Sequence, residues 1–448
     1  MRVMKFGGTS VGKPEAMIRC AELVEREIKI HGEKPVVVVS AYSKVTDLLL
    51  DAAKKAVRGD IEAPYAAVAK RHADLLNGLG LDEQIGQKNL SELHDLLRGI
   101  HMVKEVTPRL YDYVASFGER LSSKCFAALL RKRGHADAEA INAYDLGYVS
   151  DANFMNARPL PETYENIPKA FEAHKGKLVV ITGFIAKEKN GDITTNGRSG
   201  SDFTAAIFGA GLGVDEIQVW KDVPGVMTAD PTLIKTAKPL SRLSFEEASE
   251  LAYYGAEVLH PATMVPAIKR GIPVRVLHTF DPEAPGTLIT VEGVSDPAHP
   301  VKSIVYKEDQ VLINVRSERM LGMEGFMARL FEVFARNGIV IDMISTSEVS
   351  VSLTTDITDE KRLAALNKDL SEFSKVDIQR DKCIVAIVGE GMKHTVGLAS
   401  RAFKAVAAAG VSLQMISQGA SEINITFLID NAQIPNTIKS LHQEFFGQ

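Results

Sequence analysis

The residues best able to do chemistry near the start of the sequence surround a glycine pair. Lys5 lies at the end of a strand-like segment, and Gly7, Gly8 and Ser10 follow closely. Two glycines let backbone N–H groups approach an anion, and the start of a helix adds positive potential. A fixed cation such as Lys5 can neutralise the oxygens of a transferring phosphoryl group. The segment therefore indicates a phosphate site, although a simple tight turn would use the same residue types.

The same segment nearly matches the phosphate-binding loop of another enzyme class. From Gly7 to Lys13 the spacing is that of a P-loop, but Pro14 stands where a Ser or Thr hydroxyl would bind Mg²⁺. Proline is instead typical of the first residue of a helix, so we expect a helix over 14–30. A P-loop NTPase stays an alternative function, and it would make Lys13 rather than Lys5 essential.

A second polar cluster lies in the middle of the chain. Arg198, Ser201 and Asp202 belong to a glycine-punctuated loop that leads into an apolar helix. Ser201 and Asp202 fall where the N-cap residue of that helix is expected. Arg198 adds something that capping does not need, because a guanidinium group can bind a carboxylate through two hydrogen bonds. Asp202 could also orient lysines that face phosphates.

A strand-like segment farther along ends in Lys221 and Asp222, and two turns rich in proline and glycine follow. Loops at the carboxyl ends of parallel strands are where α/β proteins bind ligands. Lys221 could contact phosphates, and the apolar surface around Met227 could hold an adenine ring. An ordinary loop is the alternative interpretation.

Apolar strands must hold these loops in place. Short runs rich in β-branched residues alternate with helical patterns at 36–39, 178–181, 217–220 and 274–277. This alternation predicts buried parallel strands in an α/β domain. A proline-rich passage over 281–300 predicts the main domain boundary.

The C-terminal part contains an internal repeat. Residues 311–345 align without a gap to residues 383–417, and ten of the 35 aligned pairs are identical. Each copy has the pattern of a strand, a glycine-containing loop, a helix and a second strand. The repeat predicts two related α+β modules.

Composition excludes several classes of protein. The net charge is −5 without a long basic stripe, which argues against nucleic acid as a partner. The three cysteines are far apart and no Cys/His cluster occurs, which argues against zinc sites and disulfides. No apolar run reaches the ~20 residues that span a bilayer, and no secretory signal is recognisable. We therefore expect a cytoplasmic protein without a membrane segment.

Several motifs together resemble the aspartate kinase family within the amino acid kinase fold, and the resemblance covers essentially the whole chain. The repeated modules resemble the ACT domains of the same family, in particular of its lysine-sensitive members without a dehydrogenase part. The motifs that carry the resemblance are residues 5–11, 40–41, 46–49, 117–119, 197–202, 222–231 and 255–261.

The resemblance implies an α/β fold with three parts. These are a catalytic domain over 1–292, with a mainly parallel sheet sandwiched by helices, and two α+β ACT modules of the ferredoxin-like type over 303–380 and 381–448, with strands that can be exchanged between the modules. It implies transfer of the γ-phosphoryl group of ATP to the side-chain carboxylate of L-aspartate, the first step of lysine, threonine and methionine biosynthesis. Mg²⁺ would be bound through ATP rather than by protein side chains, and a homodimer or a higher homo-oligomer is implied.

The resemblance also implies residue roles. Lys5 and Asp202 would be catalytic, and Thr46, Glu119, Arg198 and Ser201 would bind aspartate. ATP would contact residues from both glycine-rich regions, namely Gly7, Gly8, Ser10, Lys221, Asp222, Met227, Asp230 and Pro231. Two positions depart from the family pattern, since Glu257 and Thr232 stand where basic residues are common.

The first ACT copy carries carboxylates near its second strand that the second copy lacks. A diamino effector needs such anions, so we expect feedback inhibition by lysine, with threonine as the alternative effector. The effector-binding residues expected are Met320, Gly325, Asp342, Ser345 and Glu348. A non-catalytic amino-acid sensor is a further alternative, and the complete set of Lys5, Glu119, Arg198 and Asp202 argues against it.

Overall fold

The computed structural model describes residues 1–255, 259–293, 296, 298–317, 320, 324–393, 395–419 and 421–447. The chain divides into two compact units. Unit 1 comprises Met1–Val226, Ser241–Phe245 and Val258–Glu292, and unit 2 comprises Met227–Leu240, Glu246–Glu257 and Gly293–Gln448. The segments 227–240 and 246–257 fall within the range expected for the catalytic domain, but they pack with unit 2.

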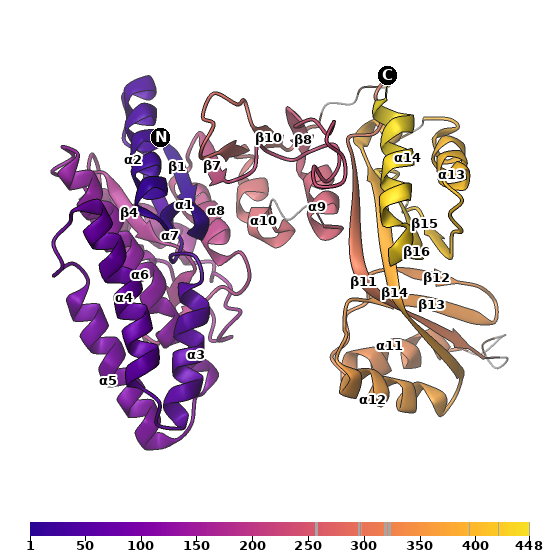
Figure 1. Cartoon of the computed structure of the whole chain (residues 1–448), viewed down its shortest axis with the longest axis horizontal. Coiled ribbons are helices and arrows are strands. Elements are labelled where there is room, and N and C mark those ends of the chain that lie inside the picture. The colour runs from indigo at the N-terminus through magenta and orange to yellow at the C-terminus, as the bar shows by residue number, and fades with distance from the viewer. Residues whose placement is uncertain are drawn as a thin grey trace. The chain divides into compact units, whose positions relative to one another are not determined.

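Unit 1 contains an eight-stranded sheet in the order β3-β4-β2-β1-β7-β9-β10-β8, of which β1, β4, β7, β8 and β10 are labelled in Figure 1. All neighbouring strands are parallel except β9 and β10. The mainly parallel α/β sheet expected from the β-branched runs is thus confirmed. Its strands are β1 (Arg2–Phe6), β2 (Val36–Val39), β3 (Glu139–Ile141), β4 (Val179–Thr182), β7 (Glu216–Lys221), β8 (Arg242–Ser244), β9 (Val274–His278) and β10 (Thr287–Thr290).

Helices cover this sheet, and a small hairpin stands beside it. The hairpin consists of β5 (Ile185–Lys187) and β6 (Ile193–Thr195). The helices of unit 1 are α1 (Gly8–Val11), α2 (Pro14–His31), α3 (Val45–Val57), α4 (Glu62–Leu79), α5 (Gln87–Val103), α6 (Pro108–Lys132), α7 (Thr163–Phe171), α8 (Gly200–Leu212) and α10 (Pro261–Arg270). Pro14 is the first residue of α2, as predicted. Among the described residues, no helix is long and apolar enough to cross a membrane.

The alternation of side chains along β1 directs its lysine toward α8. Met4 and Phe6 belong to the core cluster that the strands form with α2 to α6. Successive side chains of a strand point to opposite faces, so Lys5 points to the other face of the sheet. The close packing of Gly209 in α8 against Ile217 of β7 puts α8 on that face. The alternation therefore places Lys5 on the α8 side of the sheet, where its ammonium group contacts Asp202 in the first turn of α8.

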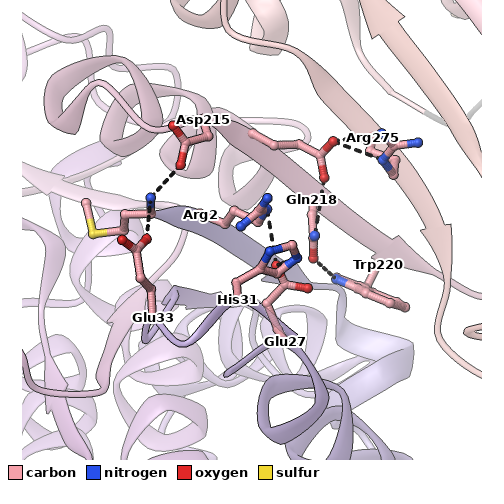
Figure 2. Close-up of polar contacts among 10 residues, drawn as sticks. Arg2, Glu27, His31, Glu33, Asp215, Gln218, Trp220 and Arg275 are labelled. Carbon is pink, nitrogen blue, oxygen red and sulfur yellow. Dashed lines mark hydrogen bonds and ion pairs between the residues drawn. The ribbon is translucent and has the colours of Figure 1, made fainter. Parts of the chain in front are cut away.

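Hydrogen bonds and ion pairs join neighbouring elements at the opposite, amino-terminal end of these strands (Figure 2). The amino group of Met1 lies 2.6 Å from Asp215 Oδ2 and 2.8 Å from Glu33 Oε2. Arg2 pairs with the mostly buried Glu27 of α2 at 3.2 Å. These contacts join β1 to α2 and to the turn before β7, so the charged network lies away from the carboxyl ends of the strands.

Unit 2 is built on a six-stranded antiparallel sheet in the order β12-β13-β11-β14-β16-β15. The repeat appears in this sheet, because α11 and α13 begin and end 72 residues apart and each follows a glycine in the left-handed conformation, Gly325 or Gly397. The elements are α9 (Phe245–Tyr253, which begins on the last residue of a unit 1 segment), β11 (Ser303–Arg316), α11 (Phe326–Arg336), β12 (Ile344–Thr346), β13 (Ser350–Thr355), α12 (Glu360–Ser371), β14 (Lys375–Val388), α13 (Leu398–Ala408), β15 (Met415–Ser417), β16 (Asn424–Asp430) and α14 (Ile434–Phe446).

The two long strands β11 and β14 are shared by both halves of this sheet. The first part of β11, 303–307, pairs with 384–388 of β14, and the second part, 310–316, pairs with 375–382 of β14 and with β13. Four strands make up each half of the sheet, and in each half one outer strand is part of the long strand of the other repeat. The two α+β halves form one continuous sheet with the apolar cores on its helix-covered sides.

Candidate active site

A buried carboxylate joins two lysines at the carboxyl ends of neighbouring strands in unit 1. Lys5 Nζ lies 2.6 Å from Asp202 Oδ1, and Lys221 Nζ lies 3.7 Å from Asp202 Oδ2. Burial alone would raise the pKa of Asp202, but the two ammonium groups outweigh it, so this pKa is lowered. The pKa of Lys221 is also lowered, mainly by burial, although Asp202 opposes that shift. Asp202 is thus ionised and holds both cations.

The register of the sheet explains why these three residues meet. Lys5 of β1 lies opposite Val219 of β7, and Lys221 lies two residues farther along β7. Residues two apart in a strand share a face, so both lysines point to the α8 side. β2 and β4 lie on one side of β1 while β7 and β9 lie on the other. Such a change of direction in strand order is where open α/β sheets bind ligands.

Asp202 belongs to the first turn of α8 rather than to its cap. The helix begins at Gly200, and its N-cap is Ser199, which makes no side-chain capping hydrogen bond. The expectation that Ser201 or Asp202 lies at the N-cap position is therefore wrong by two or three residues. The reason is that Ser199 adopts a left-handed conformation, with φ of 57°, which starts the helix early. An acidic residue in the first turn is still stabilised by the helix dipole.

A cavity of about 320 Å³ opens beside this ion pair. It brings together residues from β1, the loop after β2, α3, α6 and α8. The predicted site residues that line it are Lys5, Gly8, Thr46, Glu119, Ser201 and Asp202. Segments from five separate parts of the sequence, at 5–8, 40–47, 119, 184 and 197–202, thus converge on one cavity.

Glu119 supplies a second buried carboxyl group in this cavity. Its Oε1 accepts a hydrogen bond from the backbone N–H of Ala41 at 3.0 Å. Among the described residues no hydrogen-bond partner for the buried Oε2 is found. Burial raises the pKa of Glu119 to about 8, with the Ala41 bond opposing the shift. Such an orphaned oxygen fits the ammonium group of an amino acid, whose charge would lower the pKa again.

Several residues of the cavity wall were not among the predicted site residues, and three of them have an unusual backbone conformation. Lys44, Phe184 and Ser199 line the cavity, and all three have positive φ values, of 66°, 66° and 57°. Non-glycine residues rarely adopt this conformation, and where they do the strain is often located at functional sites. Their types give no signal in the sequence, because nothing about a lysine or a phenylalanine predicts a left-handed backbone.

Five predicted residues of unit 1 do not line the cavity: Lys221, which pairs with Asp202, and Gly7, Ser10, Arg198 and Asp222. Arg198 is exposed, and its guanidinium group instead contributes to the lowered pKa of His260, after the larger effect of burial. Ser10 is fully buried, and its hydroxyl is bonded to Thr279 Oγ1 at 3.1 Å. Gly7 is the N-cap of α1, and Asp222 is exposed next to Lys221.

The remaining predicted nucleotide contacts lie in unit 2, where each has contacts of its own. Asp230 accepts hydrogen bonds from the N–H and the hydroxyl of Thr232 at 2.8 and 2.7 Å, and from Tyr306 at 2.7 Å. Thr232, which departs from the family pattern, is thus fixed in the turn after Asp230. The carbonyl of Met227 accepts from Ser303 at 2.8 Å, and Pro231 is exposed. Glu257 lies outside the described residues.

The residues predicted to bind the effector belong to the first repeat of unit 2. Asp342 has a side chain only 3% exposed, and it accepts hydrogen bonds from Tyr253 at 2.6 Å and from the Lys307 ammonium group at 2.9 Å. Gly325 caps α11, and Ser345 is in β12. Met320 packs on the apolar core of this repeat, and Glu348 is exposed. Asp342, one of the two carboxylates expected to bind the effector, thus already binds the ammonium group of a lysine side chain.

Two family descriptions match the chain. Residues 1–278 match the amino acid kinase family, and residues 313–368 and 385–445 match the ACT domain. Both matches agree with the resemblance seen in the sequence motifs.

Individual relatives match over nearly the whole chain. Aspartokinase 1, chloroplastic, of Arabidopsis thaliana is 40% identical over 99% of this chain and 80% of its own length. Lysine-sensitive aspartokinase 3 of Escherichia coli is 32% identical over 99% of both chains. Among solved structures, E. coli aspartokinase III in complex with aspartate and ADP has a TM-score of 0.83 at 30% identity, covering both chains completely. The complex of that enzyme with lysine and aspartate has a TM-score of 0.80 at 31% identity, over 100% of this chain and 99% of the other.

Proposed function

The chain belongs to the aspartokinase family, and on that premise we propose which of its residues carry the reaction. The reaction is ATP-dependent phosphoryl transfer to aspartate. Its acceptor is a carboxylate that is already ionised at neutral pH, so no general base is needed. Catalysis then depends on positioning the two substrates and on neutralising the charge that develops on the phosphoryl oxygens.

Lys5 is the residue we assign to the transferring phosphoryl group. Its ammonium group is nearly buried, borders the cavity and is held at 2.6 Å by Asp202. A cation that is fixed before the reaction needs no reorganisation when charge develops. Lys221, held by the other oxygen of Asp202, would contact the remaining phosphates. Asp202 is thus a positioning residue for both lysines.

The substrate aspartate is assigned to the cavity beside this pair. The unpartnered Oε2 of Glu119 would accept a hydrogen bond from the substrate ammonium group, and the hydroxyls of Thr46 and Ser201 line the same cavity. Arg198 follows Gly197, which lines the cavity, and we propose that its guanidinium group binds a substrate carboxylate. That step requires a change of its side-chain position, since Arg198 itself is not part of the lining.

The nucleotide is assigned to the backbone of Gly7 and Gly8, with Ser10, Lys221 and Asp222 from unit 1 and Met227, Asp230 and Pro231 from unit 2. Ser10 would act through the shape of its loop, because its hydroxyl is occupied by Thr279. The ATP-bound Mg²⁺ would be held by phosphate oxygens and water. Both oxygens of Asp202 face lysines, so this carboxylate offers no free ligand to the metal.

The observation that carries this proposal is the Lys5–Asp202–Lys221 ion-pair triad beside the buried Glu119. An assay that traps the acyl phosphate with hydroxylamine tests it, with ATP and either aspartate or glutamate as acceptor. We expect product with aspartate and little with glutamate, because one extra methylene would misplace the attacking carboxylate relative to Lys5. Turnover with glutamate alone, or hydrolysis of ATP without trapped product, would overturn the substrate assignment.

Feedback inhibition by lysine is also part of the proposal. Asp342 is nearly buried and already accepts a hydrogen bond from the ammonium group of Lys307, which supports its binding the ammonium group of a free lysine. Gly325, Met320, Ser345 and the exposed Glu348 would complete the site. Calorimetry with lysine and with threonine separates the two effectors, and binding of threonine alone would contradict the assignment.

Further proposals concern the domain boundaries, the assembly, the location and the pathway. We propose a catalytic domain over 1–292, ACT modules over 303–380 and 381–448, a homodimer, a cytoplasmic location and the first step of lysine biosynthesis by the diaminopimelate pathway. The Arabidopsis relatives are named as chloroplastic proteins. Sedimentation of the purified chain would test the homodimer, and a monomer at all concentrations would contradict it.

A further inference from the structure

A second cavity, in unit 2, has a basic lining that the kinase reaction does not use. Its volume is about 340 Å³, and it is bordered by the segment 227–240, by residues 298–302 and by α13 and α14. The last two helices lie side by side (Figure 1). Of the described residues that line this cavity none is Asp or Glu, and five are basic: Lys238, His299, Lys302, Arg401 and His442.

Two of these basic residues have a carboxylate partner nearby. Arg401 Nε lies 2.7 Å from Glu444 Oε1, and His299 Nδ1 lies 3.0 Å from Asp296 Oδ2. For the ammonium groups of Lys238 and Lys302, no ion pair is found within the part of the chain that the structure describes. Within the described part of the chain, the cavity wall therefore carries two ammonium groups without an ion-pair partner, and a bound anion would neutralise their charge.

Neutral donors complete the polar side of the cavity. The hydroxyl of Thr228 accepts a hydrogen bond from the backbone N–H of Lys238 at 3.0 Å, and it also lies within hydrogen-bond distance of His442 Nε2, at 3.2 Å. Burial and then the charge of Lys238 lower the pKa of His442. The imidazole is accordingly neutral near pH 7, so one of its ring nitrogens is a donor and the other an acceptor.

The other side of the cavity is aromatic. Phe445 and Phe446, at the end of α14, line it. The ring of Phe446 lies 4.8 Å from that of His442, and Arg401 lies 5.0 Å above the ring of Phe445. These two contacts hold the rings of Phe445 and Phe446 in place. The cavity thus has an apolar surface in addition to the two lysines.

We propose that this cavity binds a small phosphate ester, with the phosphate group between Lys238 and Lys302 and the organic group against Phe445 and Phe446. A phosphate dianion matches two ammonium groups in charge and accepts several hydrogen bonds from them. The aromatic wall favours an ester over free phosphate, because it buries apolar surface of the ligand. A bound ligand would hold the segment 227–240 against α14. This site goes beyond the phosphoryl transfer and does not depend on the roles proposed for it.

The test is calorimetric titration of the full chain with phenyl phosphate, inorganic phosphate and succinate. Saturating aspartate and a non-hydrolysable ATP analogue keep the kinase site occupied. The variant Lys238→Ala/Lys302→Ala removes both unpaired charges. Its matched control is Lys404→Ala/Lys439→Ala, which removes two exposed lysines of α13 and α14 that do not line the cavity.

We expect phenyl phosphate to bind most tightly and the first variant to weaken it by about tenfold or more, as for the loss of two charge-assisted hydrogen bonds. Lys238→Arg should retain binding and Lys238→Glu should abolish it, while the control should equal the unmodified chain. Equal affinity of both double variants would overturn the proposal. So would a preference for succinate, or complete loss of binding when the ATP analogue is present, which would assign the cavity to the nucleotide.

Discussion

The carboxyl group of Glu119 is kept protonated by burial near neutral pH when no substrate is bound, because its pKa is raised to about 8. Aspartate binding to its ionised form must then release a proton. We predict that kcat/KM for aspartate rises with pH, by up to about tenfold per unit, and levels off near pH 8. Steady-state kinetics across this range measure it. A profile that is flat between pH 6 and 8 would contradict a role for the ionised group.

The raised pKa of Glu119 also predicts how the unfolding free energy depends on pH, with Glu119→Gln as the reference variant. The carboxyl group of Glu119 keeps its proton in the folded state, whereas in the unfolded chain the same group loses it above a pKa of about 4.3. The unfolding free energy of the natural chain should therefore fall, relative to the variant, as pH rises from about 4.5 to about 8. Denaturant titrations at several pH values measure this difference. The same variant should raise KM for aspartate on the order of 10- to 100-fold, since it loses a charged hydrogen-bond partner.

Lys307 gives a prediction about the effector at the same scale. Its ammonium group occupies Asp342 at 2.9 Å and also lies 3.1 Å from Asp356. If a free lysine binds Asp342, it competes with this internal lysine. We predict that Lys307→Met tightens lysine binding by several-fold, with the gain limited by solvent screening of a partly exposed pair. Calorimetry measures it, with Lys375→Met, an exposed lysine of β14, as control. Unchanged or weaker binding would contradict the placement of the effector.

Among the elements, the turn between β1 and α1 depends on the absence of a side chain at Gly8. A Cβ there would lie 2.8 Å from the carbonyl oxygen of Ala41, which belongs to the loop that also positions Glu119. We predict that Gly8→Ala displaces this loop and lowers kcat/KM by tenfold or more, with about 1–3 kcal/mol of stability lost to overpacking. Gly99→Ala is the control, since no atom lies within 4 Å of its added Cβ. Equal kinetics of the two variants would count against a close approach in solution.

The elements are also where sequence and structure can be compared. The strands at 36–39 and 274–277 and the helix from Pro14 were predictable, because β-branched runs and a proline at the first helical position are local signals. The start of α8 was not, since it depends on the left-handed Ser199. The convergence of Thr46, Glu119 and Ser201 on one cavity was implied only by family resemblance. Periodicity cannot show which loops meet, because that follows from the strand order.

The same limit applies to the segments 227–240 and 246–257. Their sequence continues the catalytic motifs, yet their contacts are with unit 2, including those of Asp230 with Tyr306 and of Tyr253 with Asp342. A proline-rich passage marks where the chain leaves a domain for the last time. It does not indicate which earlier segments pack in another unit, because the packing of those segments is decided by distant residues.

At the scale of the whole molecule, the proposal requires that the two units are coupled. The residues assigned to the effector belong to unit 2, and those assigned to phosphoryl transfer belong to unit 1. We predict that Asp342→Asn abolishes inhibition by lysine and leaves kcat without lysine within about twofold, since allosteric coupling needs the effector's differential contacts. Activity assays with increasing lysine measure it. Full inhibition of the variant would show that lysine acts elsewhere, for example as a competitor of aspartate.

The central claim is that Lys5, held by Asp202, stabilises the transferring phosphoryl group. The most direct measurement compares kcat for acyl phosphate formation in Lys5→Ala and Lys13→Ala. Lys13 is the exposed N-cap of α2 and the lysine that a P-loop would require. We predict that kcat falls by a factor on the order of 10² to 10³ in Lys5→Ala, as for removal of a preorganised charge, and stays near normal in Lys13→Ala. Normal turnover in Lys5→Ala, or a loss confined to Lys13→Ala, would contradict it.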